Sequence, residues 1–245
     1  MEIRNICIGK GQPKICLPIV ASTHEEVINQ ISTFHHYDLV ELRIDYYENL
    51  FNKECVLELL KQIRELLTCP IIFTYRSLKE GGHVQLTDEQ YKELVTYVCE
   101  SQLIDLIDIE INSGNQLVYE LVEIAHHHHI YVIMSNHDFK QTISKEDMID
   151  LLEKMDILGA DILKIAMMPR NYEDVIRMLE VSMNISSRIK KPLIAISMGE
   201  LGKITRICGE LTGSCITFGS ALKSSAPGQI ESSKLKMLLE AIHDE

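Results

Sequence analysis

The sequence predicts a single-domain α/β fold: an eight-stranded parallel β/α (TIM) barrel with an N-terminal hairpin that closes its floor. Short apolar, β-branched runs alternate eight times with longer amphipathic segments rich in Glu, Lys and Leu. The apolar runs are nearly continuous, as in parallel strands whose outer faces are covered by helices. Neither a Pro/Gly/Ser-rich linker nor a change in composition divides the chain, so we expect residues 1–245 to form one domain.

An open, doubly wound sheet is the main alternative for such an alternating pattern. Many sheets of that kind carry a Gly-x-Gly-x-x-Gly motif after the first strand, because glycine lets the backbone approach a bound pyrophosphate. This sequence has no such motif after its first strand. The barrel is therefore the favoured fold.

The expected elements follow one another in a regular order. Residues 3–8 and 13–17, separated by Gly9-Lys10-Gly11, are expected to pair as the N-terminal hairpin. The strands are predicted near residues 15–21, 39–46, 70–76, 104–111, 130–135, 161–166, 192–197 and 215–219. The helices are predicted at residues 23–34, 53–67, 87–99, 116–127, 145–158, 171–188, 204–209 and 232–243. Thr87 and Ser144, each followed by acidic or amide side chains, are predicted to cap two of these helices.

Composition narrows the classes of partner. With a net charge of -12 and no long Lys/Arg cluster, the chain is not expected to bind nucleic acid or an anionic membrane surface. Residues 1–9 lack the apolar core of a signal peptide, and no apolar stretch reaches membrane-spanning length, so we expect a cytoplasmic protein. The seven cysteines include no Cys-x-x-Cys pair and are expected to be reduced thiols, mostly buried.

Four consecutive histidines, at residues 126–129, are the one segment that suggests a metal. No Glu-x-x-His motif or cysteine flanks them, and four consecutive side chains cannot all face one ion. We interpret them as a solvent-exposed turn at a helix C-terminus, where they interact favourably with the helix dipole.

Lys164 is the most informative single residue. It lies within the run Asp161-Ile-Leu-Lys-Ile-Ala-Met-Met168, where a strand should bury every side chain. Removing an ammonium group from water favours its neutral form, and a neutral amine can attack a ketone to form an imine. The alternative is a lysine that buries its stem and directs its head to a carboxylate at the strand end.

Polar residues gather where the predicted strands end, which is the end of a β/α barrel that carries the chemistry. They are Glu41, Arg43 and Asp45, then Arg76 and Glu80, then Asp108 and Glu110, then His137, Lys164 and Arg206, and finally Ser225 and Gln229. Taken singly, Arg43 can belong to an ion-pair layer at the barrel floor, and His137 can be a hydrogen-bonded core residue. Their joint occurrence at one end of eight strands favours an active site.

Several of these segments together resemble the type I 3-dehydroquinate dehydratase family, which forms a Schiff base with its substrate. The matching segments stand in the family's order: Glu41-Leu-Arg43-Ile-Asp45, Phe73-Thr-Tyr-Arg76 with Glu80-Gly-Gly82, Asn136-His137-Asp138-Phe139, Lys164-Ile-Ala166 and Ser225-Ala-Pro-Gly-Gln229. The resemblance implies dehydration of 3-dehydroquinate to 3-dehydroshikimate, in the shikimate pathway of aromatic amino-acid biosynthesis. It also implies a homodimer that needs neither a redox cofactor nor a metal.

Carried over by position, the resemblance implies a role for nine residues. Lys164 would form the imine, His137 would act as the general acid and base, and Glu80 would pair with His137. The residues implied to contact substrate are Glu41, Arg43, Arg76, Arg206, Ser225 and Gln229.

Further expectations concern the surroundings of these residues. Arg206 is best suited to the ring carboxylate, because a guanidinium can grip a carboxylate through two parallel hydrogen bonds. Residues 199–206 are expected to fold over the substrate as a lid and, with Arg43 and Arg76, to help keep Lys164 neutral. Asp108 and Glu110 are expected to stabilise these cations from behind.

Two other functions stay open. A class I aldolase or transaldolase also uses a barrel lysine to form an imine but breaks a carbon–carbon bond, usually in a sugar phosphate bound by glycine-rich loops. The corresponding loops here offer an arginine and a Ser/Gln pair. A non-catalytic barrel that binds a small acid is the second alternative, although it gains nothing from burying Lys164.

Overall fold

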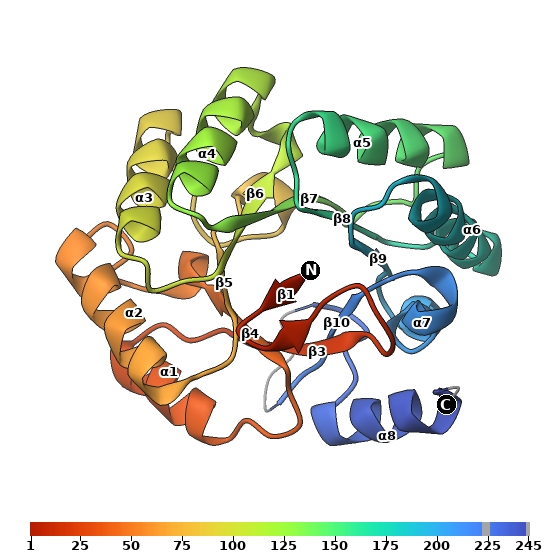
Figure 1. Cartoon of the computed structure of the whole chain (residues 1–245), viewed down its shortest axis with the longest axis horizontal. Helices are drawn as coiled ribbons and strands as arrows, with labels where there is room; N and C mark the ends of the chain where they lie inside the picture. Colours follow the sequence, from red (N-terminus) through yellow and green to blue (C-terminus); the bar gives the residue numbers. More distant parts are fainter. Residues whose placement is uncertain (222–225, 244–245) are drawn as a thin grey trace.

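Eight parallel strands form a nearly closed barrel in the computed structural model, which describes residues 1–221 and 226–243 (Figure 1). Their spatial order is β10-β3-β4-β5-β6-β7-β8-β9, so neighbours in the sequence are neighbours in the sheet. The barrel strands are β3 (Lys14–Ile19), β4 (Leu39–Arg43), β5 (Ile71–Thr74), β6 (Leu106–Glu110), β7 (Tyr131–Asp138), β8 (Ile162–Met167), β9 (Leu193–Ser197) and β10 (Ile216–Phe218). A parallel bridge between Leu193 of β9 and Ser214, which precedes β10, brings the two ends of this order together. The predicted TIM barrel is confirmed.

Helices surround the barrel on its outside (Figure 1). They are α1 (His24–Ser32), α2 (Lys53–Leu66), α3 (Asp88–Glu100), α4 (Asn115–His127), α5 (Lys145–Ile157), α6 (Tyr172–Arg188), α7 (Gly209–Thr212) and α8 (Ser232–Ile242). Short 3₁₀ helices follow four of the strands: η1 (Ile44–Tyr46), η2 (Leu78–Glu80), η3 (Ile111–Ser113) and η4 (Leu201–Arg206). None of the helices in the described part of the chain has the length and apolar composition needed to cross a bilayer.

The predicted helix caps are present. The Thr87 hydroxyl accepts a hydrogen bond from the backbone N–H of Gln90, whose side chain in turn accepts from the N–H of Thr87. Ser144 caps α5 by accepting from the N–H of Asp147. These reciprocal bonds satisfy backbone donors that the first helical turn leaves without intrahelical partners.

The helix expected at residues 204–209 was wrong in its bounds. The chain instead forms η4, reaches Cys208, and then makes the single turn α7. Gly202 allows η4 to lie against the end of β9, because a Cβ at this position would stand 2.0 Å from the carbonyl oxygen of Ser197. Gly213, with φ of +90°, ends α7 in the left-handed region that glycine adopts without steric cost.

The N-terminal hairpin closes the floor with a different pairing from the one expected. Strand β1 (Glu2–Ile3) pairs with β2 (Ile6–Cys7), whereas residues 14–19 form the first barrel strand. The connecting residues Arg4 and Asn5 both have positive φ, which matches the twist of a two-residue hairpin turn. Figure 1 shows β1 lying across the barrel opening. The sequence prediction failed because it placed the turn at glycines, although Asn also tolerates this backbone conformation.

Alternation along the strands divides the side chains into two sets. One set points outward and joins the helices in the large core. The other set points inward, and its lower layer is apolar: Cys16, Leu39, Ile72, Leu106, Ile133, Ile162, Ile194 and Ile216. These side chains form one cluster with Ile3 and Ile8 of the N-terminal hairpin segment. Above this layer, towards the C-terminal strand ends, the inward positions become polar, and this change of character defines the candidate site.

Candidate active site

Lys164 projects inward from β8 and is only 4% exposed. Its Nζ lies 2.9 Å from Oδ2 of Asp108 and 3.7 Å from Oε1 of Glu41, and 4.6 Å from the ring centroid of Phe218. The sequence raised burial and carboxylate pairing as alternatives, and the side chain has both. Two carboxylates therefore flank the amine and compensate the charge of an ammonium group buried at this position.

Asp108 is the centre of a buried ion-pair network. Its side chain has no exposed surface, and its Oδ1 accepts hydrogen bonds from Nη2 of Arg76 at 2.9 Å and from the Ser135 hydroxyl at 2.6 Å. Burial alone would raise the pKa of Asp108, but Arg76 and Lys164 outweigh that effect and lower the pKa to about 2. Asp108 is therefore a fixed negative charge and a poor proton acceptor.

Arg76 follows β5, and its guanidinium binds two carboxylates on β6. Besides Asp108 it donates to Oε1 of Glu110 at 3.0 Å, and Oε2 of Glu80 lies 3.7 Å away. These carboxylates outweigh the cost of burial, so the pKa of Arg76 is raised above its usual value. Asp108 and Glu110 thus stabilise a cation, as the sequence suggested. Much of the donor capacity of Arg76 is used within the protein, and its contact with substrate stays a prediction.

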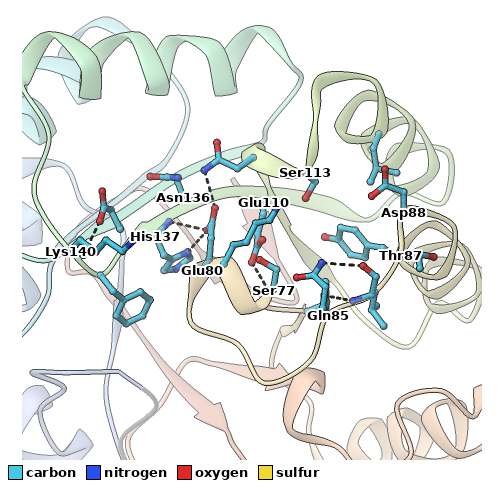
Figure 2. Close-up of a pocket in the computed structure, with 18 residues that line it drawn as sticks. Ser77, Glu80, Gln85, Thr87, Asp88, Glu110, Ser113, Asn136, His137 and Lys140 are labelled. Atoms are coloured by element: carbon cyan, nitrogen blue, oxygen red, sulfur yellow. Dashed lines mark hydrogen bonds and ion pairs between the residues drawn. The ribbon is translucent and has the colours of Figure 1, made fainter.

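Glu80 and His137 form a second buried pair. Oε2 of Glu80 accepts from the backbone N–H of His137 at 2.9 Å and forms a hydrogen bond of 3.0 Å with its ring Nδ1 (Figure 2). Burial, reinforced by Glu110, raises the pKa of Glu80 to about 8, against the opposing effects of Arg76 and the His137 amide. Burial, with Arg76, Lys164 and Arg43 nearby, holds the pKa of His137 well below its usual value. The ring is therefore neutral near pH 7, and Nε2 is the ring nitrogen left for a bound molecule.

Arg43 forms its ion pair at the mouth of the barrel rather than at its floor. Nε and Nη2 each lie 2.8 Å from an oxygen of Asp45, in the parallel geometry typical of Arg–carboxylate pairs. The guanidinium carbon lies 5.1 Å from the ring centroid of Tyr46. The floor instead holds Asp105, which pairs with Arg4 and Arg64.

Arg206 differs from Arg43 and Arg76 because its buried guanidinium binds backbone carbonyl groups. It is 2% exposed, and its Nη1 and Nη2 donate to the carbonyl oxygens of Phe218 at 3.1 Å and Pro227 at 3.0 Å. Nε has no hydrogen-bond partner, and no carboxylate of the described residues forms an ion pair with this side chain. Burial lowers the pKa of Arg206 to about 10. A buried guanidinium without a counterion is suited to receive an anion from outside the chain.

The segment expected to act as a lid is packed in this structure. Thr205 donates to the carbonyl oxygen of Gly202 and accepts from the backbone N–H of Ser197. Gly202, Thr205 and Arg206 are all buried. The position of this segment fits a cover for the cavity, and its movement stays a prediction.

One cavity brings the predicted residues together. Eight of the nine line it, namely Glu41, Arg43, Arg76, Glu80, His137, Lys164, Arg206 and Gln229. The ninth, Ser225, lies outside the described residues. The sequence interpretation missed the apolar part of the wall, formed by Ala166, Ile196, Met198, Phe218 and others. Strand alternation could have found Phe218, because it stands two positions after the inward-facing Ile216.

Comparison with known proteins gives one consistent family. Residues 15–245 match the family model described as type I 3-dehydroquinase. A protein of Clostridium novyi named 3-dehydroquinate dehydratase is 42% identical over 100% of this chain and 98% of its own length. A Listeria welshimeri protein of the same name is 41% identical, over 98% and 97% of the two chains.

Solved structures agree with the sequence comparisons. A type I 3-dehydroquinate dehydratase from Clostridium difficile, with covalent modified comenic acid, superimposes with a TM-score of 0.95 at 38% identity. The match covers 99% of this chain and 97% of that one. The 3-dehydroquinate dehydratase from Enterococcus faecalis gives a TM-score of 0.92 at 34% identity over 100% of both chains.

Proposed function

The chain belongs to the type I 3-dehydroquinase family, and from this premise we propose that it dehydrates 3-dehydroquinate to 3-dehydroshikimate through an imine on Lys164. The reaction would be a step of the shikimate pathway leading to aromatic amino acids. One observation supports it most directly: Lys164 and the Glu80–His137 pair line the same cavity. That cavity therefore contains a nucleophile and a general acid and base.

The first step makes the amine reactive. Lys164 has to lose a proton, and Asp108, with its pKa of about 2, does not take it. His137 is neutral and lines the same cavity, so its Nε2 accepts the proton. The amine then adds to the ketone carbon, and the resulting carbinolamine loses the ketone oxygen as water to give a protonated imine.

The second step removes the proton next to the former ketone. The positive imine nitrogen acts as an electron sink, so the adjacent C–H bond becomes acidic enough for His137 to abstract its proton. The electron pair of that bond moves into an enamine. Glu80 accepts a hydrogen bond from Nδ1 of His137 and stabilises the imidazolium that forms.

The third step eliminates the β-hydroxyl. The nitrogen lone pair re-forms the C=N bond, and the electrons of the enamine C=C bond form the new ring double bond and expel this hydroxyl. His137 donates the proton it had taken, so the leaving group departs as water. The low pKa of His137 makes its protonated form a strong acid for this purpose. Addition of water to the product imine releases 3-dehydroshikimate and regenerates Lys164, and the net change is the loss of one water.

The charged and polar side chains of the cavity suggest how the substrate binds. The carboxylate of 3-dehydroquinate is the anion we assign to Arg206, whose guanidinium is buried without an acidic partner among the described residues. Glu41, Arg43 and Gln229 line the same cavity and are assigned to the ring hydroxyls. Ser225, which lies outside the described residues, and Arg76 are retained as further candidate contacts.

Borohydride trapping tests the imine. Wild-type protein incubated with 3-dehydroquinate and borohydride should gain one reduced adduct on the peptide that contains Lys164, and the enone absorbance of the product should appear without borohydride. Lys164→Ala should lose both signals. Lys145→Ala is the matched control, because its amine is exposed and pairs with Glu180 on the outer helices. Activity in Lys164→Ala would exclude the imine route.

The same measurements separate the alternatives. An aldolase would form an adduct on Lys164 without producing the enone, and a non-catalytic binding barrel would form neither. A homodimer and a cytoplasmic location are also proposed from family membership. Analytical ultracentrifugation tests the first and cell fractionation the second.

A further inference from the structure

A second, larger cavity adjoins the Glu80–His137 pair. It has a volume of about 390 Å³, and Glu80 and His137 line both it and the cavity that contains Lys164. Figure 2 shows this pair at one end of the second cavity and Thr87 and Asp88 at the other, with Ser77 and Glu110 between them. The pair is thus part of the wall between the two cavities.

Asn112 reaches Glu80 from the wall of the second cavity. Its Nδ2 donates a hydrogen bond of 3.1 Å to Oε1 of Glu80. Asn112 lies in η3, directly after β6, and the buried Ile111 before it fixes this turn against the core. Asn112 does not line the cavity that contains Lys164.

The hydrogen bonds divide between the two oxygens of Glu80. Both bonds from His137 end on Oε2, and Asn112 is the side-chain donor that the described residues supply to Oε1. Burial and the neighbouring carboxylate of Glu110 both oppose ionisation of Glu80. A neutral amide donor on Oε1 opposes them, because an N–H group binds a charged carboxylate oxygen more strongly than the carbonyl oxygen of a carboxylic acid.

The charge of Glu80 controls the state of His137. An ionised carboxylate can only accept, so Nδ1 of His137 carries the proton and Nε2 is left as the basic nitrogen. A protonated Glu80 can donate to Nδ1 instead, and this leaves Nε2 carrying the ring proton and unable to act as a base. The hydrogen bond on Oε1 therefore bears on catalysis although it is remote from the substrate cavity.

We propose that Asn112 is a positioning residue which favours the ionised form of Glu80 from the second cavity and so raises the fraction of His137 whose Nε2 is free to act as the base. This inference rests on the proposed function for its catalytic consequence, but the tautomer of His137 is a property of the free protein. Asn112 acts through Glu80 and touches neither substrate nor Lys164.

Three variants test this role. Asn112→Leu keeps the approximate shape and removes the donor, whereas Asn112→Asp replaces the donor with a second carboxylate. Ser113→Ala is the matched control, since Ser113 follows in the same turn and lines the same cavity without a hydrogen bond to Glu80. Asn112 is exposed, so neither substitution at this position removes buried packing.

The pH dependence of turnover is the first measurement. Loss of the donor destabilises ionised Glu80, so the acidic limb of the kcat profile should move to higher pH, by about half to one pH unit in Asn112→Leu. The movement should be larger in Asn112→Asp because of like-charge repulsion. KM should change by less than about twofold, because the substrate cavity is untouched. The pH profile of kcat for Ser113→Ala should match that of wild type.

The second measurement uses the free protein. Imidazole ¹⁵N shifts of His137 should report a proton on Nδ1 in wild type at pH 9, and the pH at which this tautomer is lost on acidification should be higher in both Asn112 variants. Unchanged shifts and an unmoved acidic limb would overturn the role of Asn112. A wild-type protein that shows the predicted ¹⁵N behaviour without dehydrating 3-dehydroquinate would instead refute the proposed function alone.

Discussion

The amine of Lys164 and the carboxylate of Asp108 form an ion pair of 2.9 Å inside the barrel, between residues on β8 and β6. Asp108 has no exposed surface and is also held by Arg76 and Ser135. This pair explains how a strand can bury a lysine, because the charge is compensated on site. A nucleophilic amine has to be neutral, so in the proposed reaction Lys164 gives up this ion pair before it attacks the ketone.

Asp108→Asn should make the amine of Lys164 react more readily. Without the carboxylate, the amine of Lys164 loses its nearest ion-pair partner, so borohydride-trappable adduct should form faster at low pH than in wild type. Asp105→Asn is the matched control, because Asp105 pairs with arginines at the opposite end of the barrel. An adduct-forming rate that shifts to higher pH would contradict the stabilising role of Asp108.

Glu80→Gln should change how stability depends on pH. The pKa of Glu80 is raised to about 8 in the fold, whereas an unfolded chain has the ordinary value near 4.5, so the folded state holds more protons between these limits. The contribution of Glu80 to stability is therefore present below about pH 4.5 and is lost as the pH rises through about 8. Urea unfolding should show that the free energy of unfolding falls less between pH 6 and pH 9 in Glu80→Gln than in wild type. An equal decline in both proteins would contradict this assignment.

His137→Ala should slow turnover by about 10²- to 10⁴-fold, because general acid–base catalysis is lost. The imine should still accumulate on longer incubation, since water can remove the proton of Lys164 slowly. Mass spectrometry after borohydride reduction measures the adduct, and enone absorbance measures turnover. Complete failure to form any adduct would show that His137 has another role.

Arg206→Met should weaken substrate binding without an equivalent loss of stability. Removing a charged donor from the carboxylate should raise KM by about 10- to 100-fold. The same change removes a buried cation that has no acidic partner among the described residues, which offsets the loss of its bonds to Phe218 and Pro227. Thermal unfolding and kinetics, with the exposed Arg188→Met as control, would separate the two effects. An unchanged KM would exclude Arg206 as the carboxylate site.

Gly82→Ala should damage both the fold and the site. A Cβ at this position would stand 1.8 Å from the carbonyl oxygen of Arg76, so the loop that carries Glu80 must move. We expect a loss of about 3 kcal/mol in unfolding free energy, together with reduced turnover. Gly11→Ala, whose Cβ would meet nothing within 4 Å, should cost about 1 kcal/mol through its positive φ alone. Equal losses in the two variants would contradict the steric argument.

The sequence determined the barrel because hydrophobic periodicity is a local property. Each apolar run, such as the one around Lys164, reports which side chains a strand will bury, and Thr87 or Ser144 marks a helix start through bonds within a few residues. The family resemblance added the identity of eight cavity residues. The hairpin was mispredicted because Arg4 and Asn5 adopt positive φ without a glycine to mark the turn.

Tertiary structure decided which polar groups meet. Lys164 and Asp108 are 56 positions apart, and Asn112 and Glu80 are 32 apart, so their contacts depend on strand register and on the turns at the barrel rim. The absence of an acidic partner for Arg206 among the described residues is likewise a property of the assembled core. Charge and proton position follow from distances between strands, and a linear pattern specifies which side chains face inward without specifying their partners.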